Sequence, residues 1–218
     1  MRIVLLGAPG AGKGTQCKRI LDNYTLAHMS SGDILRQERA NNTELGKKAQ
    51  TYMDSGALVP DELIVEMMVK AINALTLDGF ILDGFPRTVN QASELDKSLA
   101  ANSKKLDVVL NLQVSDDIIA ERMSGRRSCP KCGAVYHLTN MKPKNEGICD
   151  NDSEPLIQRP DDDLEVVKKR LVTYHEQTEP VVGYYKKSGT AVHDIDANGG
   201  ADVVDVVIKK ILADISGS

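Results

Sequence analysis

The chain has 218 residues, of which 41% are hydrophobic and 27% charged, and its formal net charge is −4. This length and composition are ordinary for a globular protein with one sizeable core and room for an insertion. The acidic balance argues against a nucleic-acid-binding protein, because it leaves no basic excess to neutralise a phosphate backbone. No apolar run approaches the roughly 18–20 residues of a membrane-spanning helix. We therefore expect a cytoplasmic protein without a membrane or nucleic-acid partner.

A glycine-rich loop follows the first apolar run of the chain. Residues 2–6 predict a buried strand, residues 13–22 predict a helix, and residues 7–15 between them read Gly-Ala-Pro-Gly-Ala-Gly-Lys-Gly-Thr. This is the arrangement of a phosphate-binding loop, because glycines let backbone N–H groups turn toward an anion and the helix start adds its positive dipole. Lys13 would reach the terminal phosphates as a mobile charge. The alternative is an ordinary glycine turn after a strand.

The next segment reads as a short strand followed by helices. Residues 26–29 predict the strand, and the serines at 30–31 supply a hydroxyl that could cap the following helix. We expect polar helix over residues 32–55, broken near Asn41-Asn42. A further helix over residues 60–75 is indicated by apolar residues at helical spacing.

A carboxylate ends the third predicted strand, residues 80–83, and begins the run Asp-Gly-Phe-Pro-Arg at residues 83–87. Ligands of α/β proteins bind at the carboxyl ends of strands. Beside a phosphate loop, Asp83 could hold Mg²⁺ directly or through water. The stiff turn would present Arg87, although a strand-ending turn with a solvated arginine is the plainer alternative. A helix over 89–101, a buried strand over 108–114 and a helix over 116–124 follow.

Residues 126–160 break this rhythm and predict a small inserted subdomain. They contain the spacing C-x₂-C-x₁₆-C-x₂-D, which is typical of a tetrahedral zinc site made from two turns. The predicted ligands are Cys129, Cys132, Cys149 and Asp152. A structural metal would stabilise a segment too small to have its own core. His137 is a competing ligand, and unrelated buried cysteines are the alternative. Cys17, far from this group, is expected to be small core filler.

Four arginines bracket the insertion. They are Arg122, Arg126, Arg159 and Arg170. If the insertion folds as a flap, all four can converge on one point, where guanidinium groups would stabilise a transferring phosphoryl group. Asp161 and Asp162 would position the arginines that precede the insertion, or would start the next helix. Solvated arginines are the alternative.

The last elements complete an α/β pattern. Residues 161–187 predict a long helix kinked at Pro180, residues 190–195 a strand, and residues 203–215 a helix. Strands that alternate with helices predict a parallel sheet covered on both faces.

Taken together, these motifs resemble those of the adenylate kinase family in its long, zinc-lid form. The matching stretches, in the family's order, are 7–15, the acceptor segment near 30–36, 83–87, Gly-Arg-Arg at 125–127, the zinc lid, Arg-Pro-Asp-Asp at 159–162, and Arg170. The resemblance implies an α/β P-loop three-layer sandwich with a five-stranded parallel sheet. It implies a core of residues 1–29, 60–121 and 160–218, an AMP-binding segment of residues 30–59, and a zinc-binding lid of residues 122–159.

The resemblance also implies a reaction and a set of residues. The reaction is ATP + AMP ⇌ 2 ADP with Mg²⁺, by direct in-line transfer without a phosphoenzyme, in a monomer whose two mobile segments close to exclude water. The implied ATP-binding residues are Gly10, Ala11, Gly12, Lys13, Gly14, Thr15, Arg122, Arg126, Val135, Tyr136 and His137. The implied AMP-binding residues are Ser31, Arg36, Ala57, Leu58, Val59, Gly84, Phe85, Pro86, Arg87, Gln91, Arg159 and Arg170. The implied catalytic residues are Lys13, Asp83, Arg87, Arg122, Arg126, Arg159 and Arg170.

Within this resemblance Gln91 would bond the acceptor adenine, and Ser31 stands where most members carry threonine. One alternative function is a kinase that prefers UMP or CMP as the acceptor, and the residues at 31 and 91 favour AMP. Another is a nucleotide-switched binding protein that docks partners through its zinc ribbon. The acidic balance and the absence of an Asn-Lys-x-Asp guanine signature count against that second alternative.

Overall fold

A five-stranded sheet lies at the centre of the computed structural model, which describes residues 1–217. Its strands are β1 (Arg2–Gly7), β2 (Ala27–Ser30), β3 (Phe80–Asp83), β4 (Val108–Gln113) and β7 (Val192–Asp196). Their order is β2-β3-β1-β4-β7, and every neighbouring pair is parallel. Leu5 of β1 pairs with Asp83 of β3, so the carboxylate and the glycine loop leave the same edge of the sheet. The predicted parallel α/β sheet is confirmed.

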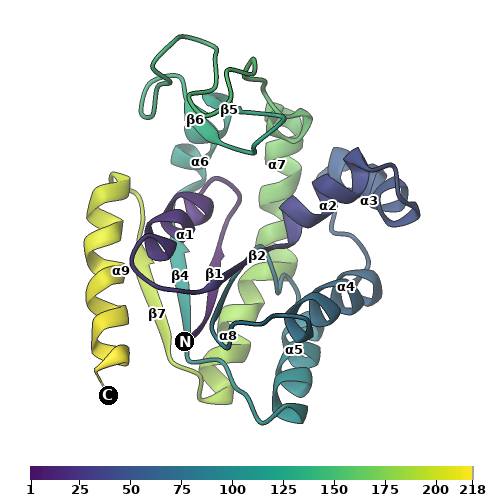
Figure 1. Ribbon diagram of the computed structural model, residues 1–218, viewed down its shortest axis with the longest axis vertical. Coiled ribbons are helices and arrows are strands. Elements are labelled where there is room, and N and C mark those ends of the chain that lie inside the picture. Colours follow the sequence, from purple (N-terminus) through teal and green to yellow (C-terminus); the bar gives the residue numbers. More distant parts are fainter. Residues whose placement is uncertain (218) are drawn as a thin grey trace.

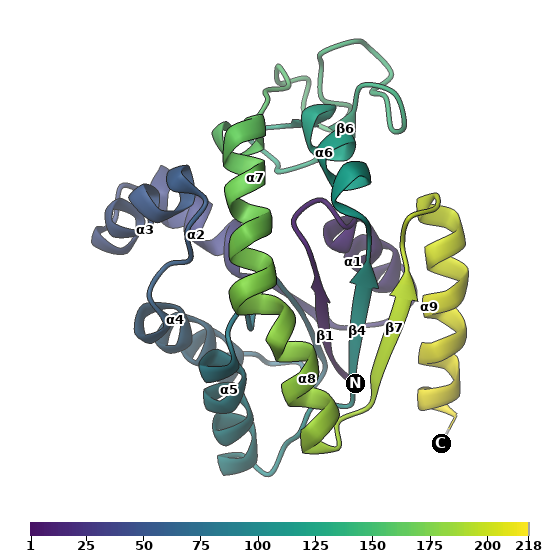
Figure 2. The same cartoon turned by 180° about the vertical axis from the view of Figure 1, so that it is seen from behind.

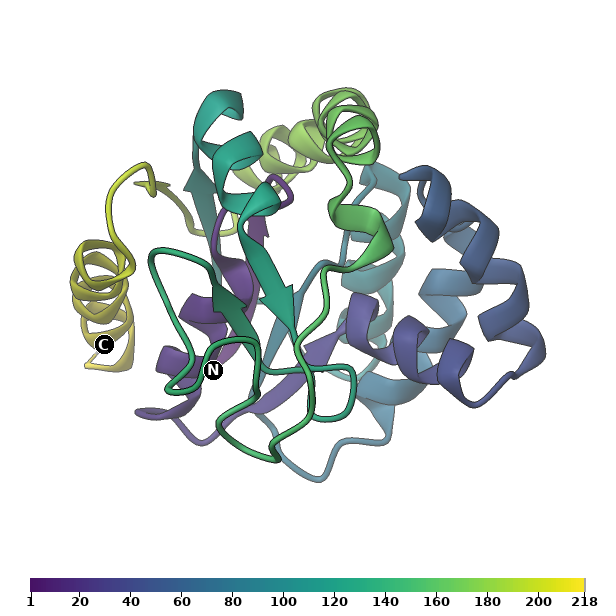
Figure 3. The ribbon, with the colours of Figure 1, turned by 90° about the horizontal axis from the view of Figure 1, so that it is seen from above.

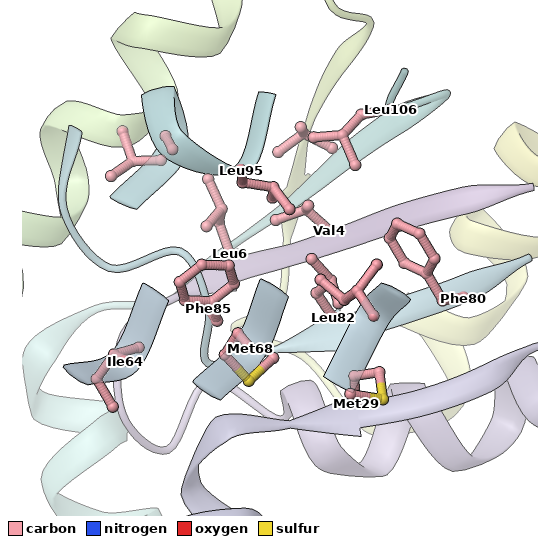
Figure 4. Packing of buried hydrophobic residues seen from close by; sticks show 14 of the residues in the cluster. Val4, Leu6, Met29, Ile64, Met68, Phe80, Leu82, Phe85, Leu95 and Leu106 are labelled. Atoms are coloured by element: carbon pink, nitrogen blue, oxygen red, sulfur yellow. The ribbon is translucent and has the colours of Figure 1, made fainter. Parts of the chain in front are cut away.

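Helices cover both faces of this sheet (Figures 1 and 2). Side chains alternate along a strand, so Val4 and Leu6 join one core cluster while Ile3 and Leu5 join another. Figure 4 shows the first cluster, in which Val4 and Leu6 lie near Phe85 and Met68. Most of its helical residues come from α4 (Asp61–Asn73), α5 (Val89–Ala101) and α8 (Glu179–Ser188). The helices that supply the second cluster are α1 (Lys13–Leu21) and α9 (Ala201–Ser216).

The predicted helix over residues 32–55 is two helices, α2 (Ser31–Ala40) and α3 (Glu44–Ser55). The chain turns between them at Asn42, whose φ is +53°, so the predicted break is confirmed. The Ser30 hydroxyl accepts a hydrogen bond from the Asp33 N–H and caps α2 as expected. Both helices project to one side of α7 (Leu164–Thr173), away from the sheet (Figures 1 and 2).

The long helix near the carboxyl end differs from the prediction at its bend. It begins as α7, widens into a π-helical segment at Tyr174–Thr178, and continues as α8. Pro180 therefore lies in the first turn of α8 rather than at a kink in a continuous α-helix. A proline has no N–H and its ring crowds the carbonyl four residues earlier, and the wider turn before it relieves that conflict.

The inserted segment lies at the end of the molecule beyond α6 (Asp116–Ser124) and the start of α7 (Figures 1 and 3). Its strands β5 (Arg126–Ser128) and β6 (Val135–His137) form an antiparallel pair separate from the main sheet. It has its own small core, made by Cys129, Ala134, Tyr136 and Cys149. Within residues 1–217, no helix is both long enough and apolar enough to cross a membrane.

Candidate functional site

The glycine loop between β1 and α1 is shaped to receive an anion. Gly7, Gly10 and Gly12 all have positive φ, a conformation that side-chain-bearing residues rarely adopt. Gly12 is the N-cap of α1, and no side chain bonds the first N–H groups of that helix. No acidic residue lies in its first turn. These N–H groups and the helix dipole are therefore available to a phosphate.

The Lys13 side chain folds back onto the glycine loop. Its ammonium donates hydrogen bonds to the Gly7 and Ala8 carbonyls, at 2.7 and 2.9 Å. Burial lowers the pKa of Lys13 to about 8, helped by the charges of Arg87 and other arginines, while Asp83 opposes the shift. The amine is thus held among cations and is ready to pair with an incoming anion.

Asp83 lies beside the loop, where β3 ends. A methyl group built on Gly14 would lie 3.7 Å from the Asp83 Oδ2, so the glycine after Lys13 leaves the carboxylate uncovered on this side. Carboxylate oxygens are the protein donors that Mg²⁺ prefers beside substrate phosphates. The residues present fit a magnesium ion that arrives with a nucleotide.

A pocket runs from the loop to the helices α2, α4 and α5. Eleven of the expected site residues line it, and Lys13 is one of them. These are Lys13, Ser31, Arg36, Ala57, Leu58, Val59, Gly84, Pro86, Arg87, Gln91 and Arg170. Phe85 is different, because its side chain is fully buried in the core cluster and does not line the pocket. One expected donor residue, Lys13, thus lies in the same cavity as most of the expected acceptor residues.

Hydrogen bonds hold the far end of this pocket. The Ser31 hydroxyl donates to the Gly84 carbonyl at 2.5 Å, which ties α2 to the turn after β3. The Arg87 guanidinium donates to the same carbonyl at 2.7 Å. Gln91 is only 1% exposed, and its Oε1 accepts from the Arg87 N–H at 2.7 Å. Its Nε2 donates to Asp61 Oδ1 at 2.8 Å.

Arginines gather where the insertion rejoins the core. Arg126 forms a two-pronged ion pair with Asp162, with Nε 2.8 Å from Oδ2 and a second bond from Nη2 to Oδ1. Arg170 donates to Asp161 Oδ2 at 2.8 Å. Burial lowers the pKa of Arg170 to about 10. Burial also lowers the pKa of Arg159 to about 10, reinforced by the charges of Arg36 and Arg126. This concentration of partly desolvated positive charge suits a polyphosphate.

Arg122 does not join this group. Its Nη2 donates to the backbone carbonyls of Ala197, Asn198 and Gly199, at 2.9 to 3.1 Å. The expectation that all four bracketing arginines converge is therefore wrong for Arg122 in this conformation. The expected pairing of Arg122 with an aspartate is wrong too, because three carbonyls of the loop before α9 take its place.

Two turns of the insertion bring the expected metal ligands together. One ligand atom from each of Cys129, Cys132, Cys149 and Asp152 lies within 4.8 Å of all the others. The Cys132 and Cys149 sulfurs are 3.5 Å apart, and the Cys129 sulfur is 3.4 Å from the Asp152 carboxylate. Thiolate and carboxylate donors at such spacing suit tetrahedral Zn²⁺. His137 lies outside this cluster, so it is not a competing ligand.

The two turns have the same backbone design. In the first, the Gly133 N–H donates to the Cys129 carbonyl at 3.1 Å, and the φ of Gly133 is +71°. In the second, the Ser153 N–H donates to the Cys149 carbonyl at 3.0 Å, and the φ of Ser153 is +59°. Ser153 therefore adopts a left-handed conformation that costs energy for any residue with a Cβ.

Three of the expected ATP-binding residues lie on β6. The Tyr136 ring is buried in the core of the insertion, where its hydroxyl accepts from the Asp150 N–H at 2.8 Å. His137 Nδ1 accepts from the backbone N–H groups of Thr139 and Asn140, and its buried Nε2 has no partner among the described residues. Val135 is half-buried at the start of the strand. None of the three lines the pocket that contains Lys13.

Some pocket residues escaped the sequence reasoning. Leu35, Met53, Ile64 and Thr178 also line the cavity. Leu35 could have been found, because it lies one helical turn after Ser31 and therefore on the same face of α2. Met53, Ile64 and Thr178 read as ordinary core positions. Only the packing of α3, α4 and the π-helical segment before α8 places them at the cavity.

Comparison with known proteins agrees with the geometry. The adenylate kinase family model matches residues 5–190 of the chain. A protein named adenylate kinase from Lachnospira eligens is 51% identical over 213 residues, covering 97% of this chain and 100% of its own. The adenylate kinases of Caldicellulosiruptor saccharolyticus and Acetivibrio thermocellus are each 50% identical, covering 97% and 100% of this chain and 99% of their own lengths.

Proposed function

The chain belongs to the adenylate kinase family, and from this membership we infer that it catalyses the reversible transfer of a phosphoryl group from ATP to AMP, giving two ADP. One observation carries the site assignment. Lys13 of the phosphate loop lines the same cavity as Arg87 and Gln91 of the acceptor side. A single chain thus supplies both halves of the cleft, which supports a monomeric enzyme. A cytoplasmic location stays a prediction from the sequence.

On the donor side, the proposal places the ATP phosphates in the loop of residues 7–15. The N–H groups at the start of α1, which no side chain caps, and the half-buried ammonium of Lys13 support this role. Mg²⁺ bound with ATP would neutralise phosphate charge, and Asp83 is the carboxylate best placed to hold its water shell. The adenine would lie toward Arg122, His137 and the loop before α9.

On the acceptor side, the proposal places AMP between α2 and the turn after β3. Arg36 and Arg87 would bind its phosphate, since both line the cavity and their charges act on each other. Arg87 is also close enough to Lys13 and Arg170 for its charge to act on both. Ala57, Leu58 and Val59 would contact the nucleoside, and Gln91 would bond the base.

The transfer itself requires no covalent enzyme intermediate. An oxygen of the AMP phosphate attacks the γ-phosphorus of ATP, and the bond from that phosphorus to the β,γ-bridging oxygen breaks. The electron pair leaves on the bridging oxygen of the departing ADP. Lys13, Arg126, Arg159 and Arg170 would stabilise the charge on the migrating group. Asp161 and Asp162 hold two of these guanidinium groups in place before substrate arrives.

Closure of the two inserted segments would exclude water. Residues 30–59 carry Arg36, which lines the pocket, and residues 122–159 carry Arg126, whose ion pair with Asp162 joins the insertion to the segment before α7. Water would otherwise compete with AMP for the γ-phosphorus. The proposed structural Zn²⁺ would hold the turns of the lid together, since that segment has only a small core of its own.

The test is the initial rate of ADP formation from MgATP with AMP, compared with MgATP alone. We expect rapid ADP formation that depends on AMP, and loss of that rate in Lys13→Met with the fold retained by circular dichroism. Lys18→Met changes an exposed lysine of the same helix and is the matched control. An unchanged rate of transfer in Lys13→Met would refute the site. A rate of ADP formation that does not depend on AMP would refute the reaction.

A further inference from the structure

The carboxylate of Asp61 connects two helices at the closed end of the acceptor pocket. Asp61 is the first residue of α4, and its Oδ2 accepts from the Thr88 hydroxyl at 2.7 Å and from Asn90 Nδ2 at 3.0 Å. Its Oδ1 accepts from Gln91 Nε2 at 2.8 Å. Thr88 is in turn the N-cap of α5 and accepts from the Gln91 N–H at 3.1 Å. The Asp61 carboxylate thus accepts hydrogen bonds from three side chains at the start of α5.

Two groups of opposite kind fix the direction of the Gln91 amide. The Arg87 N–H faces its oxygen, and the Asp61 carboxylate faces its nitrogen. If the amide were turned over, Nε2 would face the Arg87 N–H and Oε1 would face the Asp61 carboxylate. Donor would then meet donor and acceptor would meet acceptor, in a side chain that is 1% exposed. Unpaired buried polar groups are strongly disfavoured, so a single orientation is selected.

This orientation leaves a defined pair of groups for a ligand. An amide has two N–H donors and two oxygen lone pairs, and the protein uses one of each here. One donor and one acceptor remain in a fixed order, on a residue that lines the pocket. A base with a ring nitrogen acceptor beside an exocyclic amino group, as in adenine, complements them. A base with a ring N–H beside an oxo group, as in hypoxanthine, requires the reversed amide.

We propose that Asp61 is a positioning residue that locks the Gln91 amide and thereby makes the acceptor site select an amino-substituted base over an oxo-substituted one. The inference rests on the proposed function, in which Gln91 contacts the acceptor base. Asp61 does not touch the nucleotide. Its effect adds to that of the Arg87 N–H, because it makes the reversed orientation of Gln91 more costly and so strengthens the discrimination between the two kinds of base.

The test compares AMP with IMP, which differs from AMP in replacing the amino group by an oxo group and the ring nitrogen by N–H. The measured quantity is the ratio of kcat/KM for AMP to that for IMP, with MgATP as the donor. In Asp61→Asn the neighbouring amide can turn to accept either orientation of Gln91. We expect the ratio to fall about tenfold, the effect of one misplaced hydrogen bond, and to fall through KM more than through kcat. Both substrates are assayed with the same enzyme sample, so the ratio does not depend on the fraction of the protein that is folded.

Two further variants separate the possible failures. Asn90→Ala removes another partner of Asp61 without touching Gln91, and should leave the ratio unchanged even if it lowers stability. Gln91→Leu removes the base contact and should also collapse the ratio. If Gln91→Leu lowers the ratio and Asp61→Asn does not, the positioning role is overturned while the proposed function stands. If neither variant changes the ratio, or the unmodified protein uses both substrates equally, the base contact itself is overturned.

Discussion

The ion pair between Asp162 and Arg126 offers a sharp test of how the catalytic arginines are held. Asp162 has a fully buried side chain, whereas the Arg126 side chain is 19% exposed. Asp162→Asn keeps the size of the residue but removes its charge and turns one of its two acceptors into a donor. Breaking a buried pair costs about 3–5 kcal/mol, and the residual exposure of Arg126 places this change near 3 kcal/mol. For a chain of this length that corresponds to a fall in melting temperature of about 6–12 °C.

The same change should reduce catalysis, because Arg126 would no longer be held toward the cleft. A displacement of about 1 Å at a reacting centre costs on the order of 10²-fold in rate. We therefore expect kcat for ADP formation to fall by about that factor in Asp162→Asn. The assay is a steady-state rate at a temperature where both proteins are folded, with thermal melting followed separately by calorimetry.

Asp163→Asn is the matched control, since Asp163 is exposed and its carboxylate accepts the Glu165 N–H as the cap of α7. Asparagine caps helices as well as aspartate does, so both stability and kcat should be nearly unchanged. A normal kcat in Asp162→Asn would refute the reasoning that this carboxylate positions Arg126, whatever happens to the melting temperature.

Three further predictions concern the phosphate loop and the lid. The value of kcat/KM for MgATP should fall as the pH rises through about 8, because the pKa of Lys13 is lowered to about 8 and the amine loses its charge above that pH. Lys13→Arg should remove this fall. A flat pH profile in the unmodified protein would contradict the charge assignment. Metal analysis should find one zinc ion per chain in the unmodified protein and in Cys17→Ala, but none in Cys132→Ala. Removing the metal with a chelator should lower the melting temperature. Identical melting temperatures with and without metal would exclude a structural ion. Ser153→Gly should stabilise the metal-bound lid by about 0.5–1 kcal/mol by relieving its left-handed backbone, whereas Gly133→Ser should destabilise it, and hydrogen exchange of the lid amides measures both changes.

Much of the fold was predictable because its signals are local. The strand before the glycine loop is a continuous apolar run, as a strand buried on both faces must be, and both faces of β1 are indeed in core clusters. The metal ligands were predictable for a similar reason, since two short turns fix the spacing within each pair. The sequence spacing does not determine that the two turns lie side by side, and the structure shows that they do.

Other features depend on contacts between distant segments. The three carbonyls that hold Arg122 belong to a loop about 75 residues later in the chain, and no pattern near Arg122 indicates them. The contact of Asp61 with Gln91 likewise joins the starts of two helices that read separately as ordinary N-terminal turns. The π-helical segment at Tyr174–Thr178 arises from how the chain accommodates Pro180 within a packed helix, which sequence periodicity alone cannot distinguish from a kink.

The most direct test of the central claim is a crystal structure with a bisubstrate dinucleotide, two adenosines joined through a chain of phosphates. The account predicts that the ammonium of Lys13 and the guanidinium groups of Arg126, Arg159 and Arg170 surround the phosphate chain within hydrogen-bond distance, about 3.2 Å or less. A bound dinucleotide whose phosphates lie away from these four side chains would contradict it.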